Sequence, residues 1–282
     1  MKKPDISLII STYNAPEWLE KVLIGYNCQT FRDFEVIIAD DGSGNETFDI
    51  IDKIKSKVSF PIHHVWHEDR GFQKSQILNS AILACSANYI LMSDGDCIPR
   101  MDFVAQHMKN RKRGYFLSGG YFKLSMPISK EIGLKEIENQ SCFSIKWLKK
   151  RGLSRSIKNL KLTISSPWSH LLNLITPTKA SWNGHNASGW KEDILAVNGF
   201  DERMQYGGQD RELGERMVNY GIRSKQIRYG AICVHLDHPR GYKNDASIRK
   251  NKGIRKTTKR EQRTWTKFGI KKDQEIKLRE AV

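Results

Sequence analysis

The sequence predicts an α/β protein whose central sheet is mostly parallel and flanked by helices. From residue 5 to about residue 121, short apolar stretches alternate with stretches that have the periodicity of amphipathic helices. This alternation is typical of βαβ units, in which successive strands run parallel. The predicted strands are 5–11, 34–39, 61–66 and 89–92. The predicted helices are 15–29, about 46–55, and 73–85.

The second part of the chain interrupts this pattern and then resumes it. Residues 126–180 are basic and rich in Leu, Ile and Trp, so we expect a helical insertion into the α/β body, whose first half is 1–125. Residues 181–240 form the second half of the body, and 241–282 a polar, basic tail of one or two helices or partial disorder. The elements predicted in the second half are strands at 183–190 and 231–235 and helices at 192–197 and 209–220.

Length and composition fit a globular protein in a reducing compartment. The chain has 282 residues, enough for a sizeable core, and no apolar run approaches the ~20 residues that a transmembrane helix needs. Its first ten residues lack the long apolar stretch of a signal peptide. Five scattered cysteines without a CxxC pair argue against a zinc ribbon or a disulfide scaffold. We therefore expect a cytoplasmic protein.

The net charge of +16 is concentrated in two segments. Residues 139–191 contain nine Lys or Arg and no Asp or Glu, and residues 240–272 contain thirteen against two acids. Such segments suit anionic partners: nucleic acid, acidic lipid headgroups or a phosphorylated acceptor. The mixture of Trp and Leu with Lys and Arg favours docking of residues 139–180 and of the basic tail on the cytosolic face of an anionic membrane, and a solvated basic surface is the alternative.

Two carboxylates, Asp94 and Asp96, flank Gly95 directly after the predicted strand 89–92. Oxygen ligands of this kind suit Mg²⁺ or Mn²⁺, and such an ion can bridge a diphosphate. Taken alone, Asp-Gly-Asp is common, and an ordinary acidic turn is its simpler explanation. Two further polar groups, at 11–14 and 40–43, also follow strand ends. Ligands of parallel sheets bind beyond the carboxyl ends of the strands, so we expect all three groups to share one cleft.

As an ordered set, these motifs resemble the family 2 glycosyltransferases, which have a GT-A (Rossmann-like) fold. The second half resembles bacterial chondroitin-polymerase-like and galactosyltransferase-like members. The resemblance covers roughly residues 5–125 and 181–240. The matching motifs are Ser-Thr-Tyr-Asn at 11–14, Gln-Thr-Phe-Arg-Asp-Phe-Glu at 29–35, Asp-Asp-Gly-Ser at 40–43, Leu-Asn at 78–79, Asp-Gly-Asp at 94–96, Gly-His-Asn at 184–186, Gly-Phe-Asp-Glu at 199–202 and Gly-Gly-Gln-Asp at 207–210.

The resemblance implies a nucleotide pocket, a metal ion and a catalytic base. Asp41 would accept a hydrogen bond from the base of the nucleotide, which favours uracil, and Asp94 would face the ribose and the metal. Asp96 would bind Mn²⁺ or Mg²⁺, together with His235 or its rival His238. The nucleotide pocket would be completed by Ser11, Thr12, Tyr13 packed on the base, Asn14, Gly42 and Lys74 near the diphosphate.

Asp210 would be the general base, because inverting transfer needs a carboxylate to take the proton of the attacking hydroxyl. It also begins the predicted helix 209–220, where a capping role is its simpler explanation. Gln209 stands where relatives have a second acid, and Leu78 where many have an Arg. The residues implied to border the donor sugar or the acceptor are Trp182, His185, Asn186 and Gln209, with an ordinary core position as the alternative for Trp182.

The sequence therefore predicts an inverting, metal-dependent hexosyl- or N-acetylhexosaminyltransferase. The donor would be a nucleotide sugar, most readily a UDP-sugar, and the acceptor a saccharide or lipid-linked saccharide of bacterial surface polysaccharide or lipopolysaccharide assembly. One alternative is a catalytically inactive sugar-nucleotide-binding partner. The other is a nucleic-acid-binding protein, which the basic segments suit but which no nucleic-acid-binding motif supports.

Overall fold

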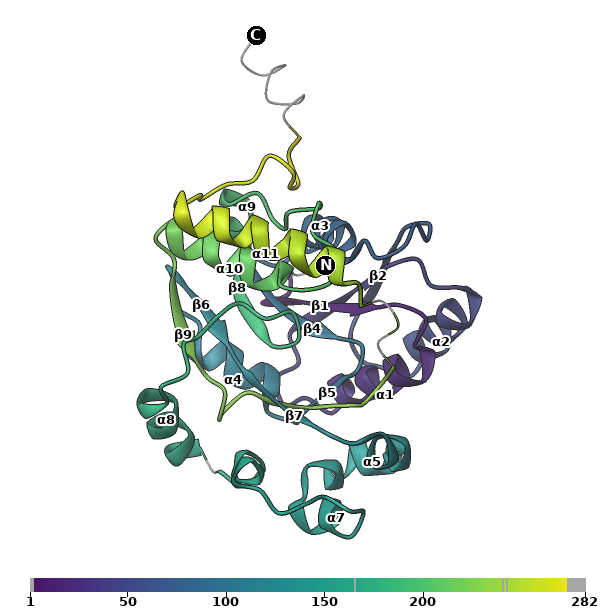
Figure 1. Cartoon of the computed structure of the whole chain (residues 1–282). Helices are drawn as coiled ribbons and strands as arrows, with labels where there is room; N and C mark the ends of the chain where they lie inside the picture. The colour runs from purple at the N-terminus through teal and green to yellow at the C-terminus, as the bar shows by residue number, and fades with distance from the viewer. Residues whose placement is uncertain (1–2, 165, 240, 242, 273–282) are drawn as a thin grey trace.

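The computed structural model describes residues 3–164, 166–239, 241 and 243–272, and it contains two sheets. The larger sheet has seven strands in the order β3-β2-β1-β4-β8-β6-β9, with helices on both faces (Figure 1). Its first four strands are parallel, which confirms the predicted class of fold. These strands are β1 (Ile6–Thr12), β2 (Phe34–Asp40), β3 (Ile62–Trp66) and β4 (Tyr89–Asp94).

Strands from the second half of the sequence complete this sheet. β8 (Ala187–Trp190) lies between β4 and β6 (Tyr115–Ser118) and runs antiparallel to both. β9 (Arg223–Gln226) pairs in parallel with β6 at the far edge. The two predicted halves of the body therefore share one sheet, and their residues meet along its length.

A smaller sheet joins a strand of the second half of the chain to two strands of the first half. It consists of β5 (Cys97–Pro99), β10 (Ile232–His235) and β7 (Gly120–Lys123) in that order. Its register sets His235 opposite Cys97, next to the Asp-Gly-Asp turn. A pairing between segments more than 130 residues apart thus brings a predicted metal ligand to its predicted partner.

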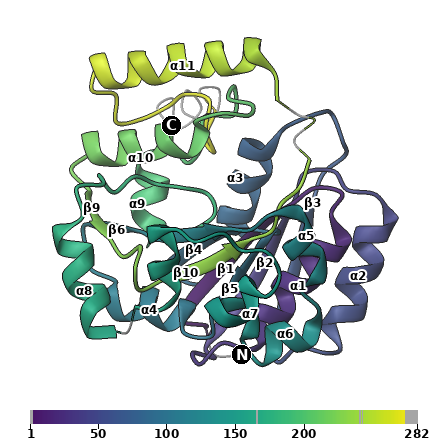
Figure 2. The ribbon, with the colours of Figure 1, turned by 60° about the horizontal axis from the view of Figure 1, so that its bottom comes forward.

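Apolar side chains of the large sheet pack on both of its faces, as expected of buried parallel strands. One core cluster joins β1 and β2 to α1 (Pro16–Asn27), α2 (Asn45–Lys55) and α4 (Phe103–Asn110). The other joins the opposite face to α3 (Lys74–Ala84), α9 (Lys191–Ala196) and α10 (Gln209–Asn219). Figure 2 shows the two layers on either side of the sheet.

The predicted insertion is a series of short helices at the lower edge of the molecule in Figure 1. The described part of the chain contains no helix long and apolar enough to cross a membrane. The elements of the insertion are α5 (Met126–Glu131), α6 (Leu134–Glu138), η1 (Ser141–Phe143), α7 (Ile145–Lys149), η2 (Ile157–Leu162) and α8 (Ser166–Ile175).

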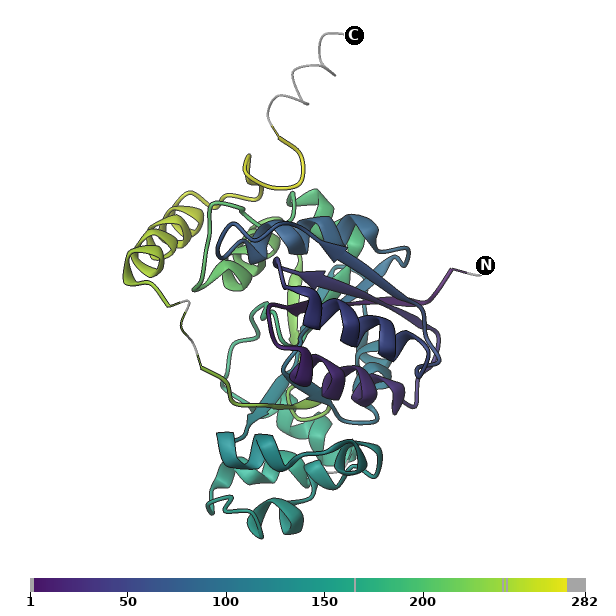
Figure 3. The same cartoon turned by 90° about the vertical axis from the view of Figure 1, so that its right-hand side faces the viewer.

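The predicted basic tail begins as an ordered part of the body. Residues 245–260 form one helix, α11 (Asp245–Arg260), which packs on α10, and the connection from β10 leads up to it (Figure 3). Asn244 caps its N-terminus by accepting hydrogen bonds from the amides of Ala246 and Ser247. The last part of the predicted tail, 273–282, lies outside the described residues.

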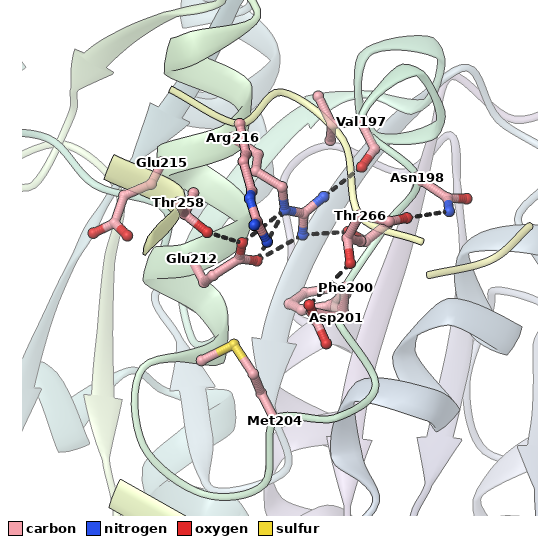
Figure 4. Close-up of polar contacts among 12 residues, drawn as sticks. Val197, Asn198, Phe200, Asp201, Met204, Glu212, Glu215, Arg216, Thr258 and Thr266 are labelled. Carbon is pink, nitrogen blue, oxygen red and sulfur yellow. Dashed lines mark hydrogen bonds and ion pairs between the residues drawn. The ribbon is translucent and has the colours of Figure 1, made fainter. Parts of the chain in front are cut away.

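A buried ion pair fixes α10 to its neighbours (Figure 4). The Arg216 guanidinium donates to both carboxylate oxygens of Glu212 at 2.8–2.9 Å and to the carbonyl oxygens of Val197 and Gly199. Thr258 of α11 donates to the same Glu212 carboxylate at 2.9 Å. Glu212 and Arg216 are almost fully buried, so each charge depends on the other for compensation.

Replacing Arg216 by Gln should therefore destabilise the protein strongly. The substitution leaves the Glu212 carboxylate buried without a cation, and loss of one partner of a buried pair costs about 3–5 kcal/mol. Urea unfolding followed by circular dichroism measures the change. Arg249→Gln, on the exposed side of α11, is the matched control and should change stability by less than about 0.5 kcal/mol. Equal stabilities for the two variants would contradict this account of the pair.

Candidate active site

The three strand-end groups of the first half meet in one cleft at the carboxyl edge of the large sheet. The cleft has a volume of about 1200 Å³, and the second half of the chain and the start of the tail form its other walls. The predicted residues that line it are Ser11, Thr12, Tyr13, Asn14, Asp41, Lys74, Asp94, Asp96, His185, Gln209, Asp210 and His235. The rival histidine, His238, lines it as well.

Lys74 and Asp94 form an ion pair at the floor of the cleft. The Lys74 ammonium donates to Asp94 Oδ1 at 2.7 Å, and Ser11 Oγ donates to the same oxygen at 2.7 Å. Burial by itself raises the pKa of Asp94, but Lys74 outweighs it and holds that pKa well below its usual range. Burial likewise opposes the charge of Lys74, yet Asp94 and Asp210 raise its pKa. Both groups therefore stay ionised at neutral pH.

Asp210, at the start of α10, lies in the same cleft in a different electrostatic state. Burial raises the pKa of its carboxyl to about 6, because the attraction of Lys74 only partly offsets desolvation and the repulsion of Asp94. Its Oδ1 is buried and has no hydrogen-bond partner among the described residues. Gly184 makes this position possible, since a Cβ there would lie 2.9 Å from Asp210 Oδ1. A carboxylate in this state is a good proton acceptor.

Asp96 gathers a set of possible metal ligands. His238 Nε2 lies 3.0 Å and His235 Nε2 3.5 Å from Asp96 Oδ2, and the two imidazoles are stacked. Cys97 completes the cluster of groups that could hold an ion, but burial raises the pKa of its thiol well above the usual value. Thiols bind metals as thiolates, so the carboxylate and the imidazoles are the donors suited to Mn²⁺.

The hydrogen bond of the second ring nitrogen, Nδ1, distinguishes His238 from His235 as a possible metal ligand. His238 Nδ1 lies 2.8 Å from the carbonyl oxygen of Pro239, and a carbonyl can only accept, so this nitrogen carries the proton. Nε2 is then the ring nitrogen that faces Asp96 and could bind a metal, and metal-binding histidines commonly donate from their other nitrogen in this way. His235 Nδ1 is buried without a partner among the described residues, so nothing comparable fixes its tautomer.

The turn after β2 forms the wall where a nucleotide base was predicted. Asp41 Oδ1 lies 2.9 Å from His67 Nε2, and its Oδ2 accepts the amide of Gln73 at 3.1 Å. Burial raises the pKa of Asp41, while His67 opposes that rise. Gly42 is not part of the wall but supplies the turn, because its φ of 97° is left-handed and a Cβ would lie 2.6 Å from Asp69 Cα.

Tyr13 and Asn14 are held at the mouth of the same pocket. The Tyr13 hydroxyl donates to Asp69 Oδ2 at 2.9 Å and leaves about half of the side chain exposed. Asn14 adopts a left-handed φ of 43°, and its Oδ1 accepts the amide of Gly44 at 3.0 Å. The Thr12 hydroxyl is buried without a partner among the described residues, so it is a free donor and acceptor at the cleft.

The structure corrects the roles predicted for Trp182 and Asn186. Both side chains are fully buried, so neither borders a sugar in the cleft. Trp182 packs in the core against Phe116, with ring centroids 5.6 Å apart. Asn186 Nδ2 donates to the carbonyl oxygens of Gly120 and Ala231, and its Oδ1 accepts from Nε2 of buried His107 at 2.8 Å. Asn186 therefore ties together the strands that position His235.

The other two residues predicted to border the sugar or the acceptor, His185 and Gln209, do line the cleft. Burial lowers the pKa of His185 to about 4, although Asp94 opposes this, so its imidazole is neutral. Gln209 lies next to Asp210, and its Oε1 accepts the amide of Gly207 at 3.1 Å. Tyr121, which the sequence analysis missed, packs its ring against His185 at 4.6 Å. Tyr121 is an exposed position of β7, in which buried and exposed residues alternate. A strand of four residues is too short for this alternation to be recognised in the sequence.

Comparison with solved structures identifies the class of fold. The chain superposes on a mannosyltransferase from Pyrobaculum calidifontis, solved with GDP-Man and Mn²⁺, with a TM-score of 0.55 at 18% identity over 86% of this chain and 59% of the other. S. aureus TarS 1-349 in complex with UDP-GlcNAc gives a TM-score of 0.56 at 14% identity, covering 84% and 60%. The chain therefore has the GT-A fold of glycosyltransferases.

Sequence comparison then gives the family. Residues 7–150 match Glycosyl transferase family 2, and the chain belongs to that family. The chain is 26% identical to the chondroitin synthase of Escherichia coli over 88% of its own length and 37% of the synthase. It is 27% identical to the hyaluronan synthase of Pasteurella multocida over 88% of its own length and 26% of that synthase, so it spans well under half of either relative. The resemblance inferred from the motifs is confirmed.

Replacing Asn186 by Ala should affect stability rather than recognition of the donor. The substitution leaves two carbonyl oxygens and one histidine nitrogen without their partner, and each buried unpaired group costs about 1–3 kcal/mol. Urea unfolding should show this loss, while the KM for the donor stays within about threefold of the original. Asn110→Ala, on α4, is the control, since its amide bonds lie outside the cleft. Unchanged stability with a much higher KM would restore the sugar-binding role.

Proposed function

We propose that this chain catalyses metal-dependent transfer of a hexosyl or N-acetylhexosaminyl group from a UDP-sugar to a saccharide hydroxyl, with inversion at the anomeric carbon. The observation that supports this most directly is the meeting of Asp94, Asp96 and Asp210 in one cleft, with Asp210 poised to take a proton. Membership of family 2 gives the reaction class, and the metal, the donor and the inverting course are our proposal.

The donor would bind across the carboxyl ends of β1, β2 and β4. Its base would lie between Tyr13 and the turn at Asp41, whose carboxylate oxygens can accept a further hydrogen bond from an N–H group such as that of uracil. Its diphosphate would lie toward Asp96 and Lys74, the ammonium at the floor of the cleft. Mn²⁺ or Mg²⁺ would be held by Asp96 and His238, with His235 beside them, and would stabilise the negative charge of the departing UDP.

The protein residues around the acceptor supply the proton transfer. The acceptor oxygen attacks the anomeric carbon from the face opposite the diphosphate, and its proton passes to the Asp210 carboxylate. The bond from the anomeric carbon to the phosphate oxygen breaks with its electron pair, so UDP leaves and the anomeric centre is inverted. His185, neutral at physiological pH, and Gln209 can hydrogen-bond sugar hydroxyls on the same side of the cleft as Asp210.

Asp210→Asn should abolish most transfer while UDP still binds. The amide keeps the size of the carboxylate but cannot take a proton, and loss of a general base costs about 10²–10⁴-fold in kcat. Turnover of a UDP-sugar panel and calorimetric titration with UDP measure the two properties. Asp49→Asn, an exposed position on α2, is the control and should leave both unchanged. A variant of near-normal rate would refute the assignment of Asp210.

The pH profile of the unsubstituted enzyme tests the same base independently. The pKa of Asp210 is raised, so the active carboxylate form is lost as the pH falls through about 6. Below that point kcat should fall about tenfold for each pH unit, while above it the rate should be nearly flat. Circular dichroism at each pH separates this loss from unfolding. A rate that stays constant from about pH 8 to about pH 5 would exclude Asp210 as the base.

Substitutions around Asp96 should weaken the binding of Mn²⁺. The loss should be larger at His238, whose Nδ1 is hydrogen-bonded, than at His235, whose Nδ1 is not. Asp96→Asn and His238→Gln should each lower the affinity for Mn²⁺ at least about tenfold, and His235→Gln should have a smaller effect. Calorimetric titration of Mn²⁺ into each variant with UDP present measures this without relying on turnover. His63→Gln, exposed on β3, serves as the control. A larger loss in His235→Gln than in His238→Gln would reverse the assignment.

Two alternatives give different results in the same assays. A catalytically inactive sugar-nucleotide-binding partner would bind UDP but would not turn over any donor with Mn²⁺. A nucleic-acid-binding protein would show neither property, and the acidic residues of the cleft speak against phosphate binding there without a cation.

A further inference from the structure

The helix α8 of the insertion has its apolar face turned away from the protein. Trp168, Leu171 and Ile175 follow the spacing of three and four residues that aligns side chains on one helix face, and all three are exposed. Ser169 and Asn173, four residues apart on another face, are directed at the body instead. Ser169 is buried, and Asn173 Oδ1 accepts the amide of Tyr229 at 3.0 Å. An ordinary surface helix of a soluble protein has the opposite arrangement.

A second segment of the insertion also exposes apolar side chains. Ile157 and Leu160 of η2 are exposed, as is Leu174 at the end of α8. We call these side chains of η2 and α8 the apolar patch; they are between 45% and 86% exposed. The members of the apolar patch are Ile157, Leu160, Trp168, Leu171, Leu174 and Ile175. Isolated exposed apolar residues are common in soluble proteins, but six in a segment of 19 residues indicate a surface that is covered in use.

The charges around the apolar patch identify what covers it. Residues 139–191 contain no acidic residue, and Arg155 and Lys158 are exposed without a carboxylate partner in the part of the chain that the structure describes. Exposed Trp, Leu and Ile next to unpaired cations fit the boundary between the headgroups and acyl chains of an anionic bilayer. An aqueous protein partner would have to provide both a large apolar surface and a complementary acidic rim.

The two basic segments of the sequence lie apart in space. Figures 1 and 2 both place α8 at the lower left of the molecule and α11 on the opposite side of the large sheet. One flat membrane surface therefore does not reach both of them, contrary to the joint docking expected from the sequence. Among the described residues, exposed apolar side chains cluster on η2 and α8 of the first basic segment, whereas α11 exposes only Ile248 of its large apolar side chains.

We infer that the apolar patch docks on an anionic lipid bilayer and that α11 does not take part. The location suits the proposed function, because η2 packs against β7, the strand from which Tyr121 faces the cleft. The inference rests on the proposed function in one respect only: membrane docking beside the cleft implies that the acceptor is linked to a lipid.

Vesicle flotation of the full chain tests the inference. The protein should float with phosphatidylcholine vesicles that contain about one quarter phosphatidylglycerol, and much less with phosphatidylcholine alone. Leu174→Ser combined with Ile175→Ser should lower the partition coefficient at least about tenfold, because each buried methylene contributes about 0.8 kcal/mol. Leu83→Ser with Val218→Ser removes two exposed apolar residues from α3 and α10 and should leave binding unchanged.

A second pair of variants separates the two basic segments. Arg155→Gln with Lys158→Gln should weaken binding to the anionic vesicles, since each basic residue near the surface contributes about 1 kcal/mol. Arg249→Gln with Lys250→Gln removes the same charge from α11 and should not. Loss of binding in the α11 pair alone, or equal binding of the unsubstituted chain to neutral vesicles, would overturn the inference.

Two further measurements test whether a second copy of the chain covers the apolar patch instead, and whether the proposed function holds. The inference fails if the unsubstituted chain does not bind vesicles and forms a dimer in sedimentation velocity that Leu174→Ser with Ile175→Ser converts to monomer. The apolar patch would then be an interface between copies. Donor hydrolysis without vesicles should be unchanged in the α8 variants. Absence of hydrolysis in the unsubstituted chain would count against the proposed function while leaving the flotation result valid.

Discussion

The cleft depends on one electrostatic constraint: several carboxylates lie together where a negatively charged diphosphate is proposed to bind. Lys74 offsets part of this charge, and it stabilises the ionised form of Asp94 more than that of Asp210. Asp94 is in direct contact with the ammonium and stays ionised, whereas Asp210 feels it only at a distance and has a pKa of about 6. One lysine thus separates two buried carboxyl groups into a permanently charged group and a group that can exchange a proton near neutral pH.

The scaffold around this cleft shows why distant parts of the sequence are needed. The first half supplies the carboxylates at strand ends, and the second half supplies Asp210, His185 and the histidines near Asp96. Asn186 donates to the carbonyl oxygens of Gly120 in β7 and of Ala231 just before β10, while Arg216 fixes α10, whose second residue is Asp210. Neither side chain needs to touch a substrate, but each determines where a substrate-facing group lies.

Much of this arrangement could be predicted from the sequence, and the failures have a physical cause. Apolar strands that end in polar motifs identified the cleft, because strand ends converge in any parallel sheet. Trp182 and Asn186 were misplaced because their burial depends on β8, whose antiparallel pairing between β4 and β6 is a long-range contact. The small sheet of β5, β10 and β7 was missed for the same reason, since strands of three or four residues have little periodicity. His67, the partner of Asp41, had no motif to mark it.

The connection between β10 and α11 has a consequence for how the protein is made. His238, Pro239, Gly241 and Asn244 belong to the wall of the cleft, and α11 follows them directly and is joined to α10 through Thr258. A nascent chain that has reached only residue 230 already contains every carboxylate of the cleft but lacks this wall. In a chain of that length the carboxylates of the cleft would lack the side that His238, Pro239, Gly241 and Asn244 provide, so the pocket is complete only once the connection to α11 has been made.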